Sequence, residues 1–279
     1  MSSHAYFHDK AVLITGASSG IGEELARQLG AAGARLTLTA RRGEKLRALA
    51  AEIGGPPATR PLALECDVTR DGDLERAVAE TVRERGQLDI AIANAGFGVV
   101  GGFGRLTLDD YRRQFETNVF GVIRTLKAAL PEVTRARGHL VVLGSVAGWV
   151  ATPKTSPYSM SKFAVRALAN AIGPELAVAG VRVTLVSPGF VASDIRRVDN
   201  QGVLHEGAPE PIPAWLVMSR EKAARQVLHA IARGRREVII TAHGKLFVAL
   251  ERFAPWVLRA AGRRMARRGR GYRPEVESR

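Results

Sequence analysis

The side chains with the clearest capacity for acid–base chemistry are a tyrosine and a lysine, Tyr158 and Lys162. A spacing of four residues places two side chains on the same face of a helix. Because a nearby ammonium favours the phenolate form, we expect the pKa of Tyr158 to lie below its usual value. Such a phenol could protonate a carbonyl oxygen while a hydride reaches the carbonyl carbon. The pair therefore indicates carbonyl reduction, with an ordinary pair of surface residues as the alternative.

A glycine-rich segment indicates a phosphate site. Residues 15–22 read Thr-Gly-Ala-Ser-Ser-Gly-Ile-Gly and follow a short apolar run. Glycines there let the backbone approach a pyrophosphate, and the N-terminus of the next helix offers it free N–H groups. The spacing matches neither G-x-G-x-x-G nor G-x-x-x-x-G-K, so a simple tight turn is the alternative. The residues expected at the phosphates are Gly16, Ser18, Ser19, Gly20, Ile21 and Gly22.

The end of the second expected strand indicates which nicotinamide cofactor would bind. An acidic residue at this point usually bonds the ribose 2′-hydroxyl in NAD enzymes. The chain instead has Arg41 and Arg42, with Ser18 expected opposite them. Two guanidinium groups could hold a 2′-phosphate by charge-assisted hydrogen bonds. This favours NADP(H) over NAD, unless the arginines simply begin the next helix at the surface.

These groups need a scaffold, and the alternation of strands and helices along the chain predicts one. Apolar runs predict strands over residues 11–15, 35–39, 61–66, 88–93, 139–144, 181–187 and 237–241. Helical spacing predicts helices over residues 20–32, 44–53, 71–85, about 108–135 and 158–178. Continuous apolar strands that alternate with helices indicate a parallel sheet covered on both faces. We therefore expect an α/β fold, a Rossmann-type doubly wound seven-stranded parallel sheet.

The expected organisation is one catalytic domain over residues 8–244 and a C-terminal helical extension over residues 245–279. Hydrophobic residues make up 46% of the chain and charged residues 24%, which is ordinary for a globular protein. An irregular segment rich in Pro and Gly, about residues 190–215, follows the sixth strand. Because ligands bind beyond the carboxyl ends of parallel strands, this segment is a candidate substrate lid.

Two further polar residues complete a pattern. Ser145 follows the fifth expected strand, thirteen residues before Tyr158, and Asn118 lies within the long preceding helix. Together with the glycine segment, these residues make the chain similar to the short-chain dehydrogenase/reductase family over roughly residues 10–245. The resemblance implies a catalytic tetrad of Asn118, Ser145, Tyr158 and Lys162.

The resemblance also implies a role for each tetrad member. Tyr158 would be the general acid in reduction, while Lys162 would lower its pKa and bind the nicotinamide ribose. Ser145 would hydrogen-bond the substrate oxygen, and Asn118 would hold a water in the proton relay. The further cofactor contacts that the resemblance implies are Asp67, Val68, Asn94, Ala95, Gly96, Pro188, Gly189, Val191 and Ser193.

The family pattern is not matched everywhere. Ala93 stands where the family often has asparagine, and Ser193 stands where threonine is more usual. Neither departure removes a member of the tetrad.

Apolar side chains near the expected crevice indicate a hydrophobic ketone or aldehyde, such as an acyl-linked, steroid-like or aldehyde substrate. The residues expected to line the pocket are Phe97, Ser145, Trp149, Phe190, Ile195 and Trp215.

The net charge of +14 is concentrated in the tail, where residues 245–279 hold ten basic and three acidic residues. The apolar stripe Leu246, Leu250, Phe253 and Val257 is followed by Arg263, Arg264, Arg267, Arg268 and Arg270, with Pro255 as a kink. A basic amphipathic helix can lie on an anionic membrane. The alternative is packing on the domain or on a neighbouring subunit.

Other function classes are less well supported by the sequence. Nucleic-acid recognition motifs are missing, so we expect no nucleic-acid partner. The rival hypothesis is a catalytically minor cofactor-binding scaffold, or a nucleic-acid or membrane-surface binding protein that acts through its tail. With one cysteine, Cys66, we expect no metal site. We expect a cytoplasmic protein, with membrane association as an alternative, and the resemblance suggests a homodimer or homotetramer.

Overall fold

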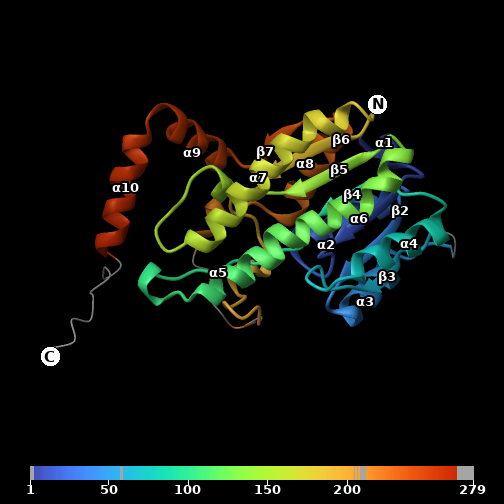
Figure 1. Cartoon of the computed structure of the whole chain (residues 1–279), viewed down its shortest axis with the longest axis horizontal. Helices are drawn as coiled ribbons and strands as arrows, with labels where there is room; N and C mark the ends of the chain where they lie inside the picture. Colours follow the sequence, from blue (N-terminus) through green and yellow to red (C-terminus); the bar gives the residue numbers. More distant parts are fainter. Residues whose placement is uncertain (1–2, 57–58, 204, 206, 208–211, 269–279) are drawn as a thin grey trace.

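The computed structural model describes residues 3–56, 59–203, 205, 207 and 212–268, and these form a seven-stranded parallel sheet (Figure 1). The spatial order of the strands is β3-β2-β1-β4-β5-β6-β7. Their bounds are β1 (Ala11–Thr15), β2 (Arg35–Ala40), β3 (Leu62–Glu65), β4 (Ile90–Ala93), β5 (His139–Leu143), β6 (Arg182–Ser187) and β7 (Glu237–Ile239). The order reverses between β1 and β4, which is where sheets of this kind bind ligands. The expected fold is confirmed.

Helices cover both faces of this sheet. They are α1 (Ser3–Phe7), α2 (Gly20–Ala31), α3 (Gly43–Ile53), α4 (Asp73–Arg85), α5 (Leu108–Phe115), α6 (Gly121–Arg135), α7 (Ser156–Ala177), α8 (Arg220–Ala232), α9 (Ala242–Phe253) and α10 (Pro255–Arg268). Shorter turns are η1 (Phe103–Arg105), η2 (Glu116–Phe120), η3 (Val146–Gly148), η4 (Asp194–Arg196) and η5 (Ala214–Leu216). Successive strand side chains point to opposite faces. Thus Val12 and Ile14 belong to one buried cluster with α2, α3 and α8, while Leu13 belongs to a second with α4, α6 and α7.

Two helical features differ from the expectation. The helix expected over residues 108–135 is interrupted by the π-helical turn η2, so α5 and α6 are separate. Helix α8 had not been expected, although its sequence carries two of the usual signals. Ser219 caps it by accepting a hydrogen bond from the Lys222 N–H at 3.3 Å. Its buried residues, which include Val227 and Ile231, recur at helical spacing.

The C-terminal arm, which we define as α9 and α10, leaves the sheet after β7. Figure 1 shows α10 in red, standing away from the sheet and joined to it through α9. The break at Ala254, just before Pro255, confirms the expected kink. A Cβ atom added at Gly262 would lie 3.9 Å from Cδ of Pro153, so α10 approaches the loop before α7. Arg270 lies outside the described residues.

Among the described residues, we found no helix with both the length and the apolar character needed to cross a membrane.

A buried histidine in the sheet, His139, makes the stability of the folded state depend on pH. The His139 side chain is fully buried in β5, and its Nε2 shares a hydrogen bond of 2.7 Å with Oγ1 of Thr184. Within the described part of the chain, Nδ1 has no hydrogen-bond partner. Burial, with a smaller contribution from the charge of Arg182, lowers the pKa of His139 to about 3. The folded state therefore strongly disfavours protonation of this ring.

We predict that His139 makes the protein less stable as the pH falls. Its stabilising contribution is complete above the unfolded pKa near 6.5 and is lost progressively toward the folded pKa of about 3. Between pH 7 and pH 5 the loss from this residue should be about 2 kcal/mol. Urea denaturation of His139→Gln should show a smaller pH dependence than the wild type. The matched control His229→Gln, at an exposed position on α8, should keep the wild-type dependence, and equal slopes for all three proteins would refute the assignment.

Candidate active site

The polar residues singled out from the sequence follow the carboxyl ends of different strands. Thr15 ends β1, Asn94 follows β4, and Ser145 lies two residues beyond β5. Pro188 follows β6, and Asp67 lies two residues beyond β3. Because all seven strands are parallel, these ends lie along the same edge of the sheet. The topology thus brings together residues that are far apart in the sequence.

Asn94 and Thr15 join the ends of β1 and β4. The hydroxyl of Thr15 accepts hydrogen bonds from the backbone N–H groups of Asn94 and Ala95, at 3.1 and 3.2 Å. The side-chain amide of Asn94 donates to the carbonyl oxygens of Thr15 and Gly16, at 2.9 and 3.1 Å. These four bonds hold the glycine segment against the Asn-Ala-Gly segment.

This close approach requires glycine at two positions. Gly16 has a φ of +67°, and a Cβ atom there would lie 2.7 Å from Cα of Ala95. At Gly22 a Cβ atom would lie 2.4 Å from Nδ2 of Asn94. Any larger residue would therefore push the glycine segment away from Asn94.

The N-terminus of α2 is open to an anion. Ser19 occupies the N-cap position in extended geometry, and its side chain makes no capping hydrogen bond. The first N–H groups of α2 consequently lack a side-chain acceptor, and the positive end of the helix dipole lies with them. Gly20 begins the helix, and Ile21 packs against the core on one side of the sheet. This arrangement fits a diphosphate group.

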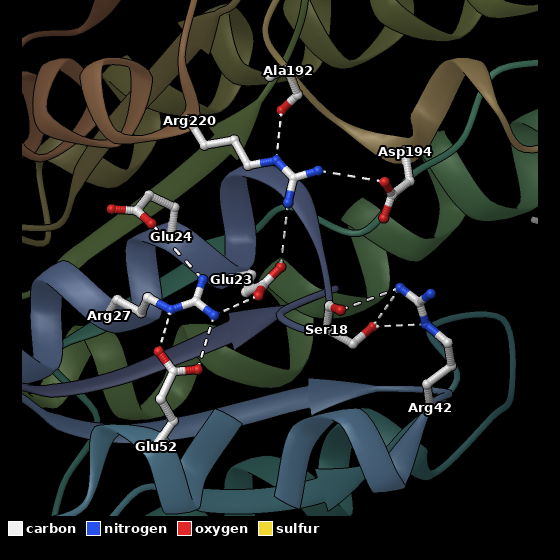
Figure 2. A network of polar contacts seen from close by, with 9 residues as sticks. All are labelled: Ser18, Glu23, Glu24, Arg27, Arg42, Glu52, Ala192, Asp194 and Arg220. Carbon is white, nitrogen blue, oxygen red and sulfur yellow. Dashed lines mark hydrogen bonds and ion pairs between the residues drawn. The ribbon is translucent and has the colours of Figure 1, made fainter. Parts of the chain in front are cut away.

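The two arginines after β2, Arg41 and Arg42, have different neighbours and different exposure. In Figure 2 the guanidinium of Arg42 faces Ser18, with its Nη2 and Nε atoms 3.0 and 3.2 Å from the serine Oγ. Arg41 is exposed, and a Cβ atom added at Gly202 in the lid would lie 3.8 Å from its Nη2. One cation therefore lies on the glycine segment, and the other faces the lid. No acidic residue ends β2, which stops at Ala40.

The π-helical turn η2 presents Asn118 to the interior. This side chain is fully buried, and its Oδ1 accepts the N–H of Phe97 at 3.1 Å. Its Nδ2 donates to the carbonyl of Phe97 at 3.0 Å and to the hydroxyl of Ser161 at 3.2 Å. π-Helical turns are frequent at functional sites because they redirect a single side chain. Asn118 thereby ties the segment after β4 to α7, and Gly96 lies against it, since a Cβ atom there would be 3.0 Å from Oδ1.

Tyr158, Lys162 and Ser145 approach one another at the start of α7. Nζ of Lys162 lies 5.8 Å from the centre of the Tyr158 ring and donates to the carbonyl of Leu143 at 2.9 Å. The Ser145 hydroxyl accepts the N–H of Ala147 at 3.1 Å and lies near enough to Tyr158 to lower the pKa of its phenol. The expected face of the helix is confirmed.

The expected lowering of the tyrosine pKa is wrong for this structure. Burial raises the pKa of Tyr158, and this outweighs the lowering by Ser145 and by the charge of Arg196. Burial also lowers the pKa of Lys162 to about 8, because its ammonium is almost completely removed from water. Desolvation here exceeds the charge effect inferred from spacing alone. At neutral pH the phenol is protonated and can act as a proton donor.

Three other residues expected to contact the cofactor, Asp67, Val68 and Val191, already contact other parts of the protein. Oδ1 of Asp67 accepts both the N–H and the hydroxyl of Thr69, at 2.9 and 2.8 Å. Val68 is buried against the start of α6, where a Cβ atom at Gly121 would lie 2.7 Å from it. The Val191 side chain is also buried in the core, so only its backbone can face the crevice.

A histidine that the sequence analysis missed supports the segment after β6. Nε2 of His243, on α9, accepts the backbone N–H of Phe190 at 2.9 Å. The two rings are stacked, with centres 5.1 Å apart and planes 21° apart. Gly189 leaves room for this contact, since a Cβ atom there would lie 2.3 Å from Nε2. An isolated histidine just after the last strand was the available sequence signal.

The residues expected to line the substrate pocket divide into two groups. Phe97, Phe190 and Ile195 are partly buried near the strand ends. Nε1 of Trp149 donates to Ser187, the last residue of β6, at 3.2 Å, and the guanidinium of Arg166 stacks 3.3 Å from the Trp149 ring centre. Trp215 is 82% exposed, so within the described structure it is not enclosed as a pocket wall.

Comparisons with known proteins agree with this geometry. The sequence profile of the family described as short chain dehydrogenase matches residues 10–203. Dehydrogenase/reductase SDR family member 7B of Mus musculus is 32% identical over 245 residues, which cover 86% of this chain and 75% of that protein. The 11-beta-hydroxysteroid dehydrogenase 1A of Arabidopsis thaliana is 32% identical over 247 residues, 83% of this chain and 68% of that protein.

A solved structure is similar over most of its length. It is the alcohol dehydrogenase from the archaeon Thermococcus sibiricus complexed with 5-hydroxy-NADP. The TM-score is 0.71 at 27% identity, and the match covers 83% of this chain and 96% of that chain.

Proposed function

Because this chain belongs to the short-chain dehydrogenase family and is an oxidoreductase, we propose that it reduces a hydrophobic ketone or aldehyde with NADPH, using Tyr158 as general acid. The observation that carries the proposal is the convergence of Ser145, Tyr158 and Lys162 beside the ends of β5 and β6. Asn118 supports the same region through its bonds to Phe97 and α7.

The donor groups around the glycine segment fit a nicotinamide dinucleotide. The uncapped N-terminus of α2 suits the diphosphate, and the approach of Gly16 to Ala95 leaves room for backbone contact. Arg42 on Ser18, together with the missing carboxylate after β2, supports NADP(H) over NAD. The archaeal relative was solved with an NADP derivative, which points in the same direction. When bound, the nicotinamide supplies the hydride.

Side chains of the protein supply the proton that the substrate oxygen takes up during reduction. The Tyr158 phenol, kept protonated at neutral pH by burial, donates its proton to the substrate carbonyl oxygen. The Ser145 hydroxyl, which lies close to Tyr158, positions the same oxygen. With a pKa of about 8, Lys162 is largely charged at neutral pH and stabilises the phenolate left after proton transfer.

The substrate class follows from the apolar residues at the crevice. Phe97, Phe190 and Ile195 are partly exposed apolar side chains in the segments that follow β4 and β6, and such side chains favour a hydrophobic carbonyl compound. Relatives named as hydroxysteroid dehydrogenases support a steroid-like compound as one candidate.

A second proposal concerns the C-terminal arm, which we infer binds an anionic membrane surface. Phe253 and Trp256 are 78% and 69% exposed, and Met265 is also exposed. Arg259 and Arg263 lie on the same helix as Trp256 and Met265. Exposed aromatic residues with neighbouring arginines are typical of helices that lie in the membrane interface. The competing partner is a second copy of the chain, in a homodimer or homotetramer.

Tyr158→Phe should lower kcat for carbonyl reduction by at least about 100-fold, because the proton donor is removed. NADPH binding, followed by fluorescence titration, should stay within about twofold of the wild type, since the ring is retained. Tyr111→Phe is the matched control: its hydroxyl hydrogen-bonds Ser156 at the start of α7, outside the proposed proton path. Substantial turnover by Tyr158→Phe would eliminate the acid role and favour the scaffold hypothesis.

Arg42→Ala should reduce the ratio of kcat/KM for NADPH to that for NADH by about 10- to 100-fold, because a charge-assisted contact is lost. Arg41→Ala should act in the same direction. Arg112→Ala removes an equal charge from an exposed position on α5 and should leave the ratio unchanged. Steady-state kinetics with both cofactors measures the effect. An unaltered ratio in both arginine variants would contradict the NADP(H) assignment.

Deleting residues 263–279 should weaken sedimentation with vesicles that contain phosphatidylserine, because several arginines are lost. Reduction of a small water-soluble carbonyl compound should be retained by the truncated protein. Neutral phosphatidylcholine vesicles provide the control. Equal sedimentation of full-length and truncated protein would exclude this part of the arm from membrane binding.

A further inference from the structure

Arg220 occupies a position that its own helix does not favour. It is the first residue of α8, and a cation in the first turn of a helix opposes the helix dipole. The next residue, Glu221, has the favourable charge. Arg220 therefore does not stabilise α8 itself, and its favourable contacts are with residues outside this helix.

Three groups surround the Arg220 guanidinium, as Figure 2 shows. Nε donates to the carbonyl oxygen of Ala192 at 3.0 Å, and Nη2 donates to Oδ1 of Asp194 at 3.4 Å. Nη1 lies 3.7 Å from Oε2 of Glu23. Ala192 and Asp194 belong to the start of the lid, which we define as residues 190–197, whereas Glu23 belongs to α2. One side chain thus joins three elements that are distant in the sequence.

Glu23 links this contact to the anion site. It directly follows Gly22 in the first turn of α2, and its second oxygen lies 2.7 Å from Nη2 of Arg27. Arg27 in turn pairs with Glu52 on α3 at 2.7 Å. A lone carboxylate here would repel a bound diphosphate, but two neighbouring arginines offset its charge. A network is also more effective than an isolated surface pair, because each side chain is already held by another partner.

The start of the lid lies directly on the glycine segment. A Cβ atom added at Gly20 would be 3.4 Å from Cβ of Ser193, which stands between the two lid residues that Arg220 holds. A surface cavity of about 370 Å³ between α2 and α3 extends to this junction, where Ser18, Ser19, Asp194 and Arg220 line it. Any movement of residues 192–194 would therefore change the surroundings of the N-terminus of α2.

We propose that Arg220 is a positioning residue that fixes the start of the lid over the cofactor diphosphate site by joining it to Glu23. This rests on the proposed function for the identity of the cofactor. Arginine suits the task because its planar group can donate in three directions, whereas the lysine ammonium is a compact point charge. Arg220 itself acts through Ala192, Asp194 and Glu23.

The first test uses hydrogen–deuterium exchange in the cofactor-free protein. Arg220→Ala should raise the exchange rate of the amides at residues 191–197 by about fivefold or more, because the start of the lid is released. Arg225→Ala is the matched control, since it removes an exposed arginine from the same helix. Arg220→Lys should restore part of the protection. Equal exchange in Arg220→Ala and Arg225→Ala would overturn the proposal.

The second test measures NADPH affinity by fluorescence titration and, separately, KM and kcat. Arg220→Ala should weaken NADPH binding and raise its KM by about 5- to 20-fold, with kcat within about twofold of the wild type. Glu23→Gln breaks the same contact, although it also removes the partner of Arg27 and a negative charge beside the diphosphate site. The effect of the double variant on NADPH affinity should be smaller than the sum of the two single effects, because both changes break the contact between Arg220 and Glu23. Additive effects, or a loss confined to kcat, would refute the coupling.

The two proposals can fail separately. If the wild type binds no NADPH, the proposed function is wrong, while exchange in the free protein still decides whether Arg220 holds the lid. If the wild type binds NADPH and Arg220→Ala behaves as Arg225→Ala does, only the positioning role is wrong. Thermal unfolding of every variant establishes that each is folded at the assay temperature.

Discussion

The close contact between the ends of β1 and β4 is the constraint on which the rest of the site depends. Four hydrogen bonds cross this junction: two join Thr15 and Asn94, one runs from Ala95 to Thr15, and one runs from Asn94 to Gly16. The close approach that they need leaves no room for a side chain at Gly16 or Gly22. The contact sets the direction in which the chain enters α2. It thereby determines where the uncapped N–H groups of that helix point, and every other cofactor group is arranged around them.

Burial sets the protonation states of Tyr158 and Lys162. The Tyr158 phenol and the Lys162 ammonium are both removed from water, which raises the pKa of the former and lowers that of the latter. Both shifts favour the uncharged forms, as desolvation requires. A protonated phenol suits carbonyl reduction, whereas alcohol oxidation would first need the phenolate.

The segment between β6 and α8 depends on side chains from elements that follow it in the chain. His243 accepts the N–H of Phe190, the backbone of Met218 pairs with Phe190 and Ala192, and Arg220 holds the carbonyl of Ala192. These contacts give an otherwise irregular segment a fixed starting point. They also connect the C-terminal arm to the crevice, because His243 belongs to α9.

The sequence by itself determined the seven strands in their order along the chain, the glycine turn and the shared helix face of Tyr158 and Lys162, since these depend on local periodicity and backbone geometry. It missed α8 and the π-helical turn at Asn118. Only the tertiary structure decided the sign of the Tyr158 pKa shift and the partners of Arg220 and His243. The physical reason is that burial and contacts between distant residues arise only when the packed elements remove groups from water.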